Sequence, residues 1–118
     1  MKPFRCLLVS LILTLVAATA AWADYGAIAY SNSSGKYGYS YGCSSRSTAE
    51  RLALNKCAAS DRRIVVWVSK GWAALAVNDA NRWGTGWSTK SRAAAERIAL
   101  SKCGGANPRI LCWINSGK

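Results

Sequence analysis

The sequence predicts an α+β fold in which two tandem β-β-α-β repeats form one small disulfide-bonded domain, with helices packed on an antiparallel sheet. Three observations lead to this prediction. A nine-residue segment occurs twice, segments with strand-like patterns flank each copy, and four cysteines follow an apparent export signal.

The duplicated segment is the strongest of these observations. Residues 49–57 read AERLALNKC and residues 95–103 read AERIALSKC, so seven of nine positions are identical at an offset of 46 residues. A period of this length is typical of a supersecondary unit rather than a whole domain. We assign the first repeat to residues 25–70 and the second to residues 72–116.

Strands are expected wherever short apolar, β-branched or alternating runs lie between turn residues. Residues 37–41, YGYSY, alternate aromatic and small side chains, which is typical of a strand with one aromatic face. The expected strands are residues 27–30, 37–41, 64–68, 74–77, 83–87 and 109–114.

The two helices have recognisable ends. Ser47 and Glu50 have capping-box spacing and predict a helix that runs to about Cys57. Ser91 is the expected cap of a second helix, which ends at Cys103 because glycines follow. Since Lys70-Gly71 joins the repeats closely, we expect a hairpin there, with both helices on one face of the sheet.

Residues 1–23 have the features of a secretory signal. Lys2 and Arg5 precede an apolar stretch at residues 7–18, and Ala21-Trp22-Ala23 resembles a cleavage site. We therefore expect a secreted or periplasmic protein whose single mature domain is residues 24–118.

Four cysteines remain after such cleavage, which in a small exported domain predicts two disulfides. Cys112 is expected to share a strand face with Ile110 and Ile114, beneath the second helix, so Cys103–Cys112 and Cys43–Cys57 are the favoured pairs. The two other connectivities remain open. The cysteine spacing and the absence of histidine do not favour a zinc site.

The net charge points to anionic partners. The chain carries 16 Lys and Arg against 5 Asp and Glu, a net charge of +11 that falls to +9 without Lys2 and Arg5. Lipid headgroups, acidic glycans and cell-wall polymers are the partners this charge favours, and nucleic acid is favoured less.

Catalytic chemistry has little support. With no histidine, Ser-His-Asp catalysis and histidine-based metal sites are excluded. Glu50 and Glu96 occupy equivalent positions and could form a glycosidase pair. We favour a structural role near the helix N-termini, with Arg63 or Arg109 as an ion-pair partner. No enzyme activity, cofactor or metal is expected.

Aromatic and basic side chains are the candidate binding residues. The rings either pack in the core and between the repeats or form a platform that stacks on sugars. Basic residues that precede the two helices could join in one patch if a pseudo-two-fold relates the repeats. The candidates are Tyr37, Tyr39, Tyr41, Trp83, Trp87, Arg46, Lys90 and Arg92.

These segments resemble a family of small exported bacterial proteins that is defined only as a domain of unknown function. The resemblance rests on the GAIA, YGYSYG, AExxAL..C and VVW segments that begin at Gly26, Tyr37, Ala49 and Val65. It implies export, disulfides and a duplicated α+β unit, and it supplies no catalytic residues. Family members often carry a cysteine just before the strand at 64–68, where this chain has Arg62-Arg63.

The expected function is therefore that of an exported, non-enzymatic binding protein acting on an anionic or glycan-rich envelope or host surface. The alternative is a secreted effector or inhibitor that binds a protein partner through a sheet edge or the aromatic face. A small hydrolase of unrecognised type is a third reading.

Overall fold

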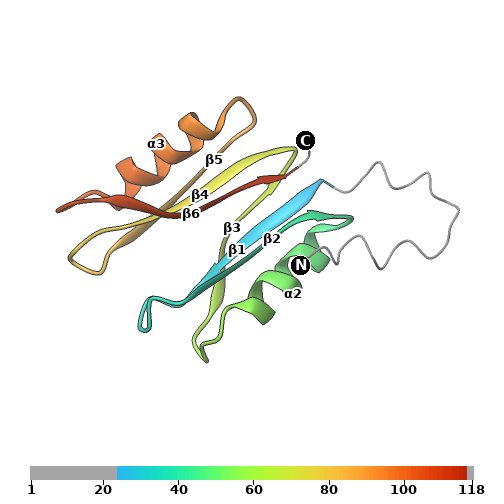
Figure 1. Cartoon of the computed structure of the whole chain (residues 1–118), viewed down its shortest axis with the longest axis horizontal. Coiled ribbons are helices and arrows are strands. Elements are labelled where there is room, and N and C mark those ends of the chain that lie inside the picture. The colour runs from blue at the N-terminus through green and yellow to red at the C-terminus, as the bar shows by residue number, and fades with distance from the viewer. Residues whose placement is uncertain (1–23, 117–118) are drawn as a thin grey trace, which may run out of the picture.

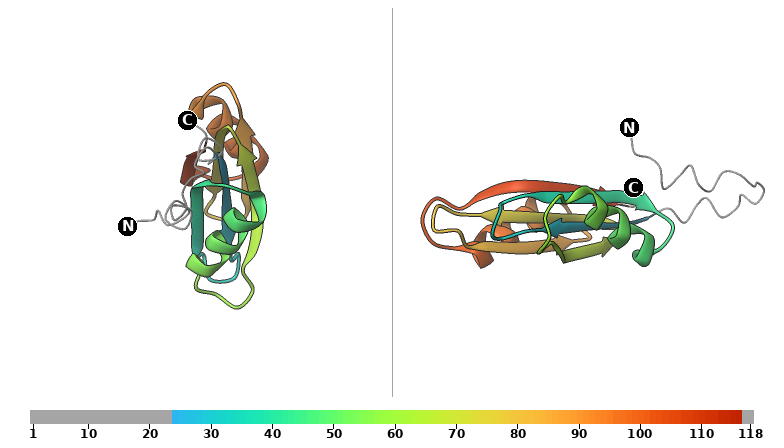
Figure 2. Two further views of the ribbon diagram at one scale, coloured as in Figure 1. Left: turned by 90° about the vertical axis from the view of Figure 1, so that its right-hand side faces the viewer. Right: turned by 90° about the horizontal axis from the view of Figure 1, so that it is seen from below.

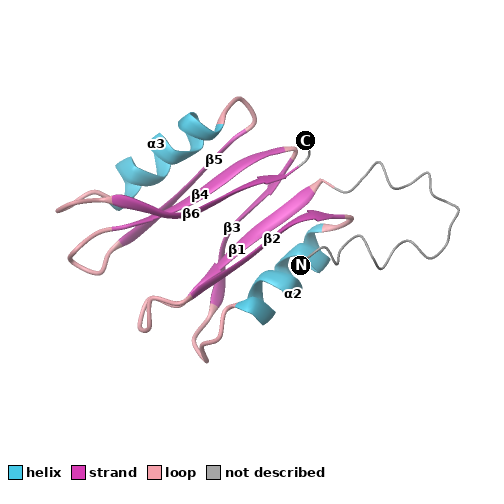
Figure 3. Ribbon diagram, viewed as in Figure 1, coloured by secondary structure: helices cyan, strands magenta, loops and turns pink. Residues whose placement is uncertain are grey.

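The computed structural model of the protein describes residues 24–116, and the predicted signal at 1–23 lies outside the described residues (Figure 1). The α+β class is confirmed (Figure 3). The described chain forms two antiparallel three-stranded sheets and two helices.

Each half of the chain forms one sheet and one helix. In the first half the sheet order is β2-β1-β3, and the elements are β1 (Tyr25–Tyr30), β2 (Tyr37–Cys43), α2 (Arg46–Lys56) and β3 (Arg63–Ser69). In the second half the order is β5-β4-β6, and the elements are β4 (Gly71–Val77), β5 (Trp83–Ser88), α3 (Arg92–Cys103) and β6 (Arg109–Ser116).

The two sheets face each other, and a helix covers the outer face of each one (Figures 1 and 2). The expected single sheet with a hairpin at Lys70-Gly71 is therefore wrong. β3 pairs with β1, and β4 pairs with β5 and β6. Lys70 adopts a left-handed φ of 58° and passes the chain from one sheet to the other.

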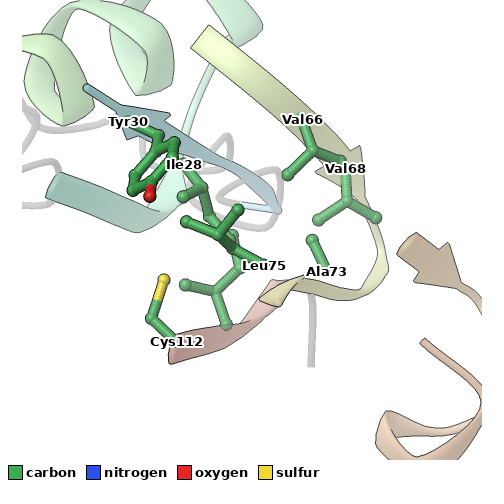
Figure 4. Packing of buried hydrophobic residues seen from close by; sticks show 8 residues of the cluster. Ile28, Tyr30, Val66, Val68, Ala73, Leu75 and Cys112 are labelled. Atoms are coloured by element: carbon green, nitrogen blue, oxygen red, sulfur yellow. The ribbon is translucent and has the colours of Figure 1, made fainter. Parts of the chain in front are cut away.

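Side chains from both sheets meet in the central core, where Ile28, Tyr30 and Leu75 lie close together (Figure 4). Each sheet contributes four buried residues to this cluster. They are Ile28, Tyr30, Val66 and Val68 from the first sheet and Ala73, Leu75, Cys112 and Ile114 from the second. The sheets are thus held together by apolar packing, the main favourable term in folding.

The helices pack closely because the contact residues are small. Ala49 and Ala53 of α2 and Ala95 and Ala99 of α3 are buried against their sheets. A Cβ at Gly86 of β5 would come within 2.4 Å of the Ala95 carbonyl oxygen, so only glycine fits beneath α3.

The helix caps are partly as expected. Ser91 caps α3, and its Oγ accepts a hydrogen bond from the Ala94 amide (3.0 Å). The capping box at Ser47 and Glu50 is wrong: the cap of α2 is Ser45, whose Oγ accepts from the Thr48 amide (3.2 Å). Glu50 is instead engaged by Arg46, one turn earlier.

The predicted Cys103–Cys112 disulfide is not formed, and both residues are free thiols. A β-bulge in the β4–β6 ladder lies between the pairs Leu75–Cys112 and Ala76–Ile110. It turns Cys112 into the inter-sheet core, whereas Cys103 packs on the α3 side. The two sulfurs therefore lie on opposite faces of the sheet.

The predicted Cys43–Cys57 disulfide is also not formed, and Cys57 is a free thiol. Cys43 lies before α2 and Cys57 follows it, so they are separated by the length of an 11-residue helix. A helix rises about 1.5 Å per residue, whereas bridged cysteines need Cα atoms within about 7 Å. The Cys57 Sγ donates instead to the Lys36 carbonyl oxygen (3.5 Å).

Candidate ligand-binding groove

Three tyrosines form a ladder along the edge strand β2. Gly38 and Ser40 face α2, so the alternating pattern turns Tyr37, Tyr39 and Tyr41 to the other face of the strand. The exposed fractions of the three side chains are 37%, 38% and 53%. Their rings stack in sequence, with centroid distances of 6.5 Å and 6.3 Å.

The ladder lines a groove between β2 and β6, the edge strands of the two facing sheets. We call it the tyrosine groove, and its volume is about 460 Å³. Its lining residues are Tyr37, Tyr39, Tyr41, Leu111, Cys112, Trp113, Ile114 and Asn115.

Two basic side chains contact aromatic residues of the tyrosine groove, although neither is among its lining residues. The Nζ of Lys56, at the end of α2, lies 5.6 Å from the centre of the Tyr39 ring. The guanidinium carbon of Arg92 lies 4.0 Å from the centre of the Trp113 ring. Both arrangements are cation–π contacts, which hold the cation beside the aromatic surface.

The phenol groups of the ladder are available to a ligand. Among residues 24–116, no hydrogen bond is made by the hydroxyls of Tyr37, Tyr39 or Tyr41. Each hydroxyl can donate one hydrogen bond and accept others. Because the rings face one another, their edges and hydroxyls meet the solvent, and a ligand would meet a row of polar groups.

The predicted basic patch of Arg46, Lys90 and Arg92 is not assembled. Arg46 begins α2 and covers Trp67, whereas Arg92 begins α3 and covers Trp113. The two helices lie on opposite outer faces, and packed sheets alone are about 10 Å apart. Lys90 lies in the turn before α3, where its amide donates to the Ser88 Oγ (3.0 Å).

The two glutamates pair within their own helices. Arg46 Nε lies 2.9 Å from Glu50 Oε2, and Arg92 Nε lies 2.8 Å from Glu96 Oε2. The expected partners Arg63 and Arg109 are wrong, because the i,i+4 arginine on the same helix face is closer. Since Glu50 and Glu96 lie on different helices on opposite outer faces, the structure does not bring them together as a carboxylate pair.

The two candidate tryptophans lie on the other side of the molecule, where β5 faces β3. Trp83 is half-buried and contacts Tyr30 edge-on, with centroids 6.0 Å apart. Trp87 is 58% exposed. The five predicted platform aromatics therefore divide between two sides, because the chain forms two sheets rather than one.

Sequence reasoning missed the β6 wall and Lys56. No pattern in the sequence marks Trp113, Leu111 or Asn115 as partners of the tyrosines. They join the groove because β2 and β6 face each other across two sheets, which local periodicity does not reveal. The position of Lys56 in the last turn of the helix was the one available signal.

Cys112 is the thiol that lines the groove, and burial raises its pKa to about 12. It is therefore protonated at neutral pH, and a thiol in that state is a poor nucleophile. Within residues 24–116 no three His, Cys, Asp or Glu side chains are grouped so that they could hold a metal ion. The groove thus offers hydrogen-bonding groups and aromatic surface, and the Lys56 ammonium lies beside its Tyr39 ring.

The model of one protein family matches residues 25–116, and its description is Domain of unknown function (DUF4189). The chain belongs to the DUF4189 family. The expected resemblance to a family defined only as a domain of unknown function is therefore confirmed.

A solved structure is similar to this DUF4189 chain, namely the NMR structure of Rv1813c from Mycobacterium tuberculosis. The two chains are 29% identical, and the TM-score is 0.65. The match covers 80% of this chain and 76% of the other. No curated protein matches the chain.

Neither the DUF4189 description nor this relative's title names a ligand, so function has to be argued from the geometry. Among the described residues of the chain, the helices are too short and too polar to cross a membrane.

Proposed function

We propose that the protein is an exported, non-enzymatic binding protein that engages an anionic, glycan-rich surface through the tyrosine groove. The observation that carries the proposal is the ladder of three exposed tyrosines whose hydroxyls have no partner among the described residues. Export rests on the signal-like residues 1–23.

The proposal treats residues 25–70 and 72–116 as two copies of one β-β-α-β unit. Its support is the repeated nonapeptide and the matching Arg–Glu–Trp arrangements on α2 and α3. On this basis, differences between the copies indicate where binding has been specialised. Tyr39 has Thr85 as its counterpart, so the complete ladder belongs to the first copy alone.

An acidic polysaccharide suits the chemistry of the groove. Its hydroxyls and carboxylates can bond to a row of phenol groups, which both donate and accept. Lys56 places a positive charge beside the Tyr39 ring, and the chain still carries +9 without Lys2 and Arg5. A nucleic-acid base would need an open ring face, but the faces within the ladder are turned toward one another.

The first test is binding of a polyuronate, with a neutral glucan as the comparison ligand. We expect the polyuronate to bind more tightly and to lose affinity as salt rises, because exposed charge attraction is screened. Tyr39→Phe keeps the ring and removes the hydroxyl. It should weaken binding by roughly fivefold, the loss of about one hydrogen bond.

Thr85→Val is the matched control, because it removes a hydroxyl at the equivalent position of the second copy and should leave binding unchanged. Equal affinity for the neutral glucan, or equal effects of the two variants, would refute the proposal.

A protein partner is the second candidate, because no strand within residues 24–116 pairs with the outer edges of β2 and β6. An extended segment could add to such an edge through backbone hydrogen bonds. Capture of a partner that persists at high salt and in Tyr39→Phe would favour this candidate over the glycan.

A further inference from the structure

A second cavity lies on the side of the molecule away from the tyrosine groove, where β3 faces β5. We call it the Arg63 pocket, and its volume is about 240 Å³. It is lined by Tyr30, Asn32, Asp61, Arg63, Val65 and Trp83. The residues come from the end of β1, the start of β3 and the start of β5, so distant segments build it.

The floor of the pocket is aromatic and fixed. Tyr30 is 5% exposed and packs edge-on against Trp83, with ring centroids 6.0 Å apart. Val65 packs against the same central core. An apolar group of modest size would find a preformed surface here, as is usual for small-ligand sites.

The rim carries one negative charge. The Asp61 carboxylate accepts hydrogen bonds from the Oγ of Ser31 (2.5 Å) and of Ser33 (2.7 Å). These bonds hold the pKa of Asp61 below its ordinary value. A carboxylate has about four acceptor positions, so two bonds leave capacity for a further donor.

The rim also carries one positive charge. The Arg63 guanidinium carbon lies 5.8 Å from the centre of the Trp83 ring. Among the described residues Arg63 makes no ion pair and no hydrogen bond through its side chain. Within residues 24–116 no acceptor therefore fixes the direction of its N–H groups, although Asp61 lies in the same pocket.

The second half of the chain shows what the same corner looks like when its charges are paired. Arg109 begins β6 as Arg63 begins β3, and its Nη1 donates to Asp79 Oδ1 (2.9 Å). Asn107 donates to the other oxygen of Asp79 (2.9 Å). Both carboxylate oxygens of Asp79 thus accept a hydrogen bond, and Arg109 has an ion-pair partner.

In the first half the acid and amide have exchanged places. Asn32, in the loop after β1, corresponds to Asp79 in the loop after β4. Asp61, before β3, corresponds to Asn107 before β6. The Ser31 and Ser33 hydroxyls donate to the Asp61 carboxylate in place of an arginine. The Arg63 guanidinium lies over the Trp83 ring instead. This exchange creates a pocket with both charges present and separate.

We propose that the Arg63 pocket binds a small zwitterion, namely an α-amino acid with an apolar side chain. The ligand carboxylate pairs with Arg63, its ammonium group pairs with Asp61, and its side chain lies on Tyr30, Val65 and Trp83. An anion alone would face Asp61, and a cation alone would face Arg63, so a ligand with both charges is the electrostatic complement. The inference is independent of the tyrosine groove.

The test is an NMR titration of the protein with leucine, following the indole N–H signal of Trp83. We expect this signal to shift saturably while the signals of Trp87 and Trp113 stay in place. N-acetylleucine lacks the ammonium group and leucinamide lacks the carboxylate. Each should bind about tenfold more weakly than leucine, since each loses a charge-assisted bond.

Variants locate the charges. Arg63→Gln and Asp61→Asn should each weaken leucine binding by about tenfold, whereas the matched change Arg109→Gln in the second half should have no effect. The analogue series uses the unaltered protein and so does not depend on variant folding. Binding of N-acetylleucine as tight as leucine, a Trp83 signal moved by glucuronate and not by leucine, or no shift at all would overturn the proposal.

Discussion

Individual residues differ between the halves at positions whose surroundings are otherwise alike. Val66 pairs with Ile28 in the first sheet, and Cys112 pairs with Leu75 in the second; both side chains enter the central core. One half thus places an aliphatic side chain where the other has an ionisable thiol. Valine at position 112 should therefore be tolerated, because Val66 occupies the equivalent position of the first sheet.

Cys112→Val should change the pH dependence of stability in alkali. Burial raises the pKa of Cys112 from 9.0 to about 12, so the folded state keeps a proton that the unfolded state releases. Its contribution is complete below pH 9.0 and falls as the pH rises from there toward about 12. Urea unfolding at about pH 8 and about pH 10 should show the parent losing roughly 1 kcal/mol more than the variant.

If the parent and the variant lost the same unfolding free energy between the two pH values, Cys112 would have to ionise as readily in the folded state as in the unfolded state. Cys103→Ala is a suitable comparison, because this buried cysteine lies on the α3 side of the sheet, apart from the central core.

At the level of elements, close helix packing depends on which strand residues lack a side chain. Glycines between aromatic residues, as in β2 and β5, allow either close approach by a ligand or close packing within the protein. Gly38 meets α2 and Gly86 meets α3, each within 2.4 Å of a helix carbonyl oxygen if a Cβ is added. They therefore serve the helices, and the tyrosine ladder occupies the opposite face.

Gly86→Ala should destabilise the protein by about 1–3 kcal/mol, because the added methyl group pushes α3 away from β5. Thr85→Ala, one residue earlier and on the other strand face, is the control and should cost clearly less. Chemical unfolding measures both free energies, and equal losses would show that α3 adapts without strain.

Much of the element order could be predicted because each strand and helix has a local signature. Alternation in YGYSY, serine caps and glycine stops act over a few residues. The bulge beside Cys112 has no such signature, since one extra residue in β6 reverses the faces without changing composition. The incorrect Cys103–Cys112 pairing followed directly from that reversal.

At the level of the whole molecule, the number of sheets decides which candidate residues meet. A hairpin at Lys70-Gly71 would have aligned all aromatics on one sheet. Because the chain passes at Lys70 from one sheet to the other, the tyrosines lie beside β6 and Trp83 lies beside β3. Sequence reasoning found the five rings, but the partners of each ring depend on contacts between distant segments.

The shared core predicts that the two sheets unfold together. Leu75→Ala removes a fully buried side chain at their interface and should cost about 2–5 kcal/mol. Ile98→Ala, at an exposed position of α3, should cost much less.

Because the cluster draws on both sheets, the loss should appear as one transition when circular dichroism and tryptophan fluorescence are compared. Two separate transitions would show that each half folds by itself.

The connection at Lys70 also sets how folding depends on the amount of protein. Two units that bury four side chains each against the other would, if separate, have to find one another in solution. Joining them through Ser69-Lys70-Gly71 gives each unit a high effective concentration of its partner. Cutting the chain at Lys70 should therefore make stability rise with protein concentration, whereas a cut in the hairpin loop at 32–35 leaves the two units joined.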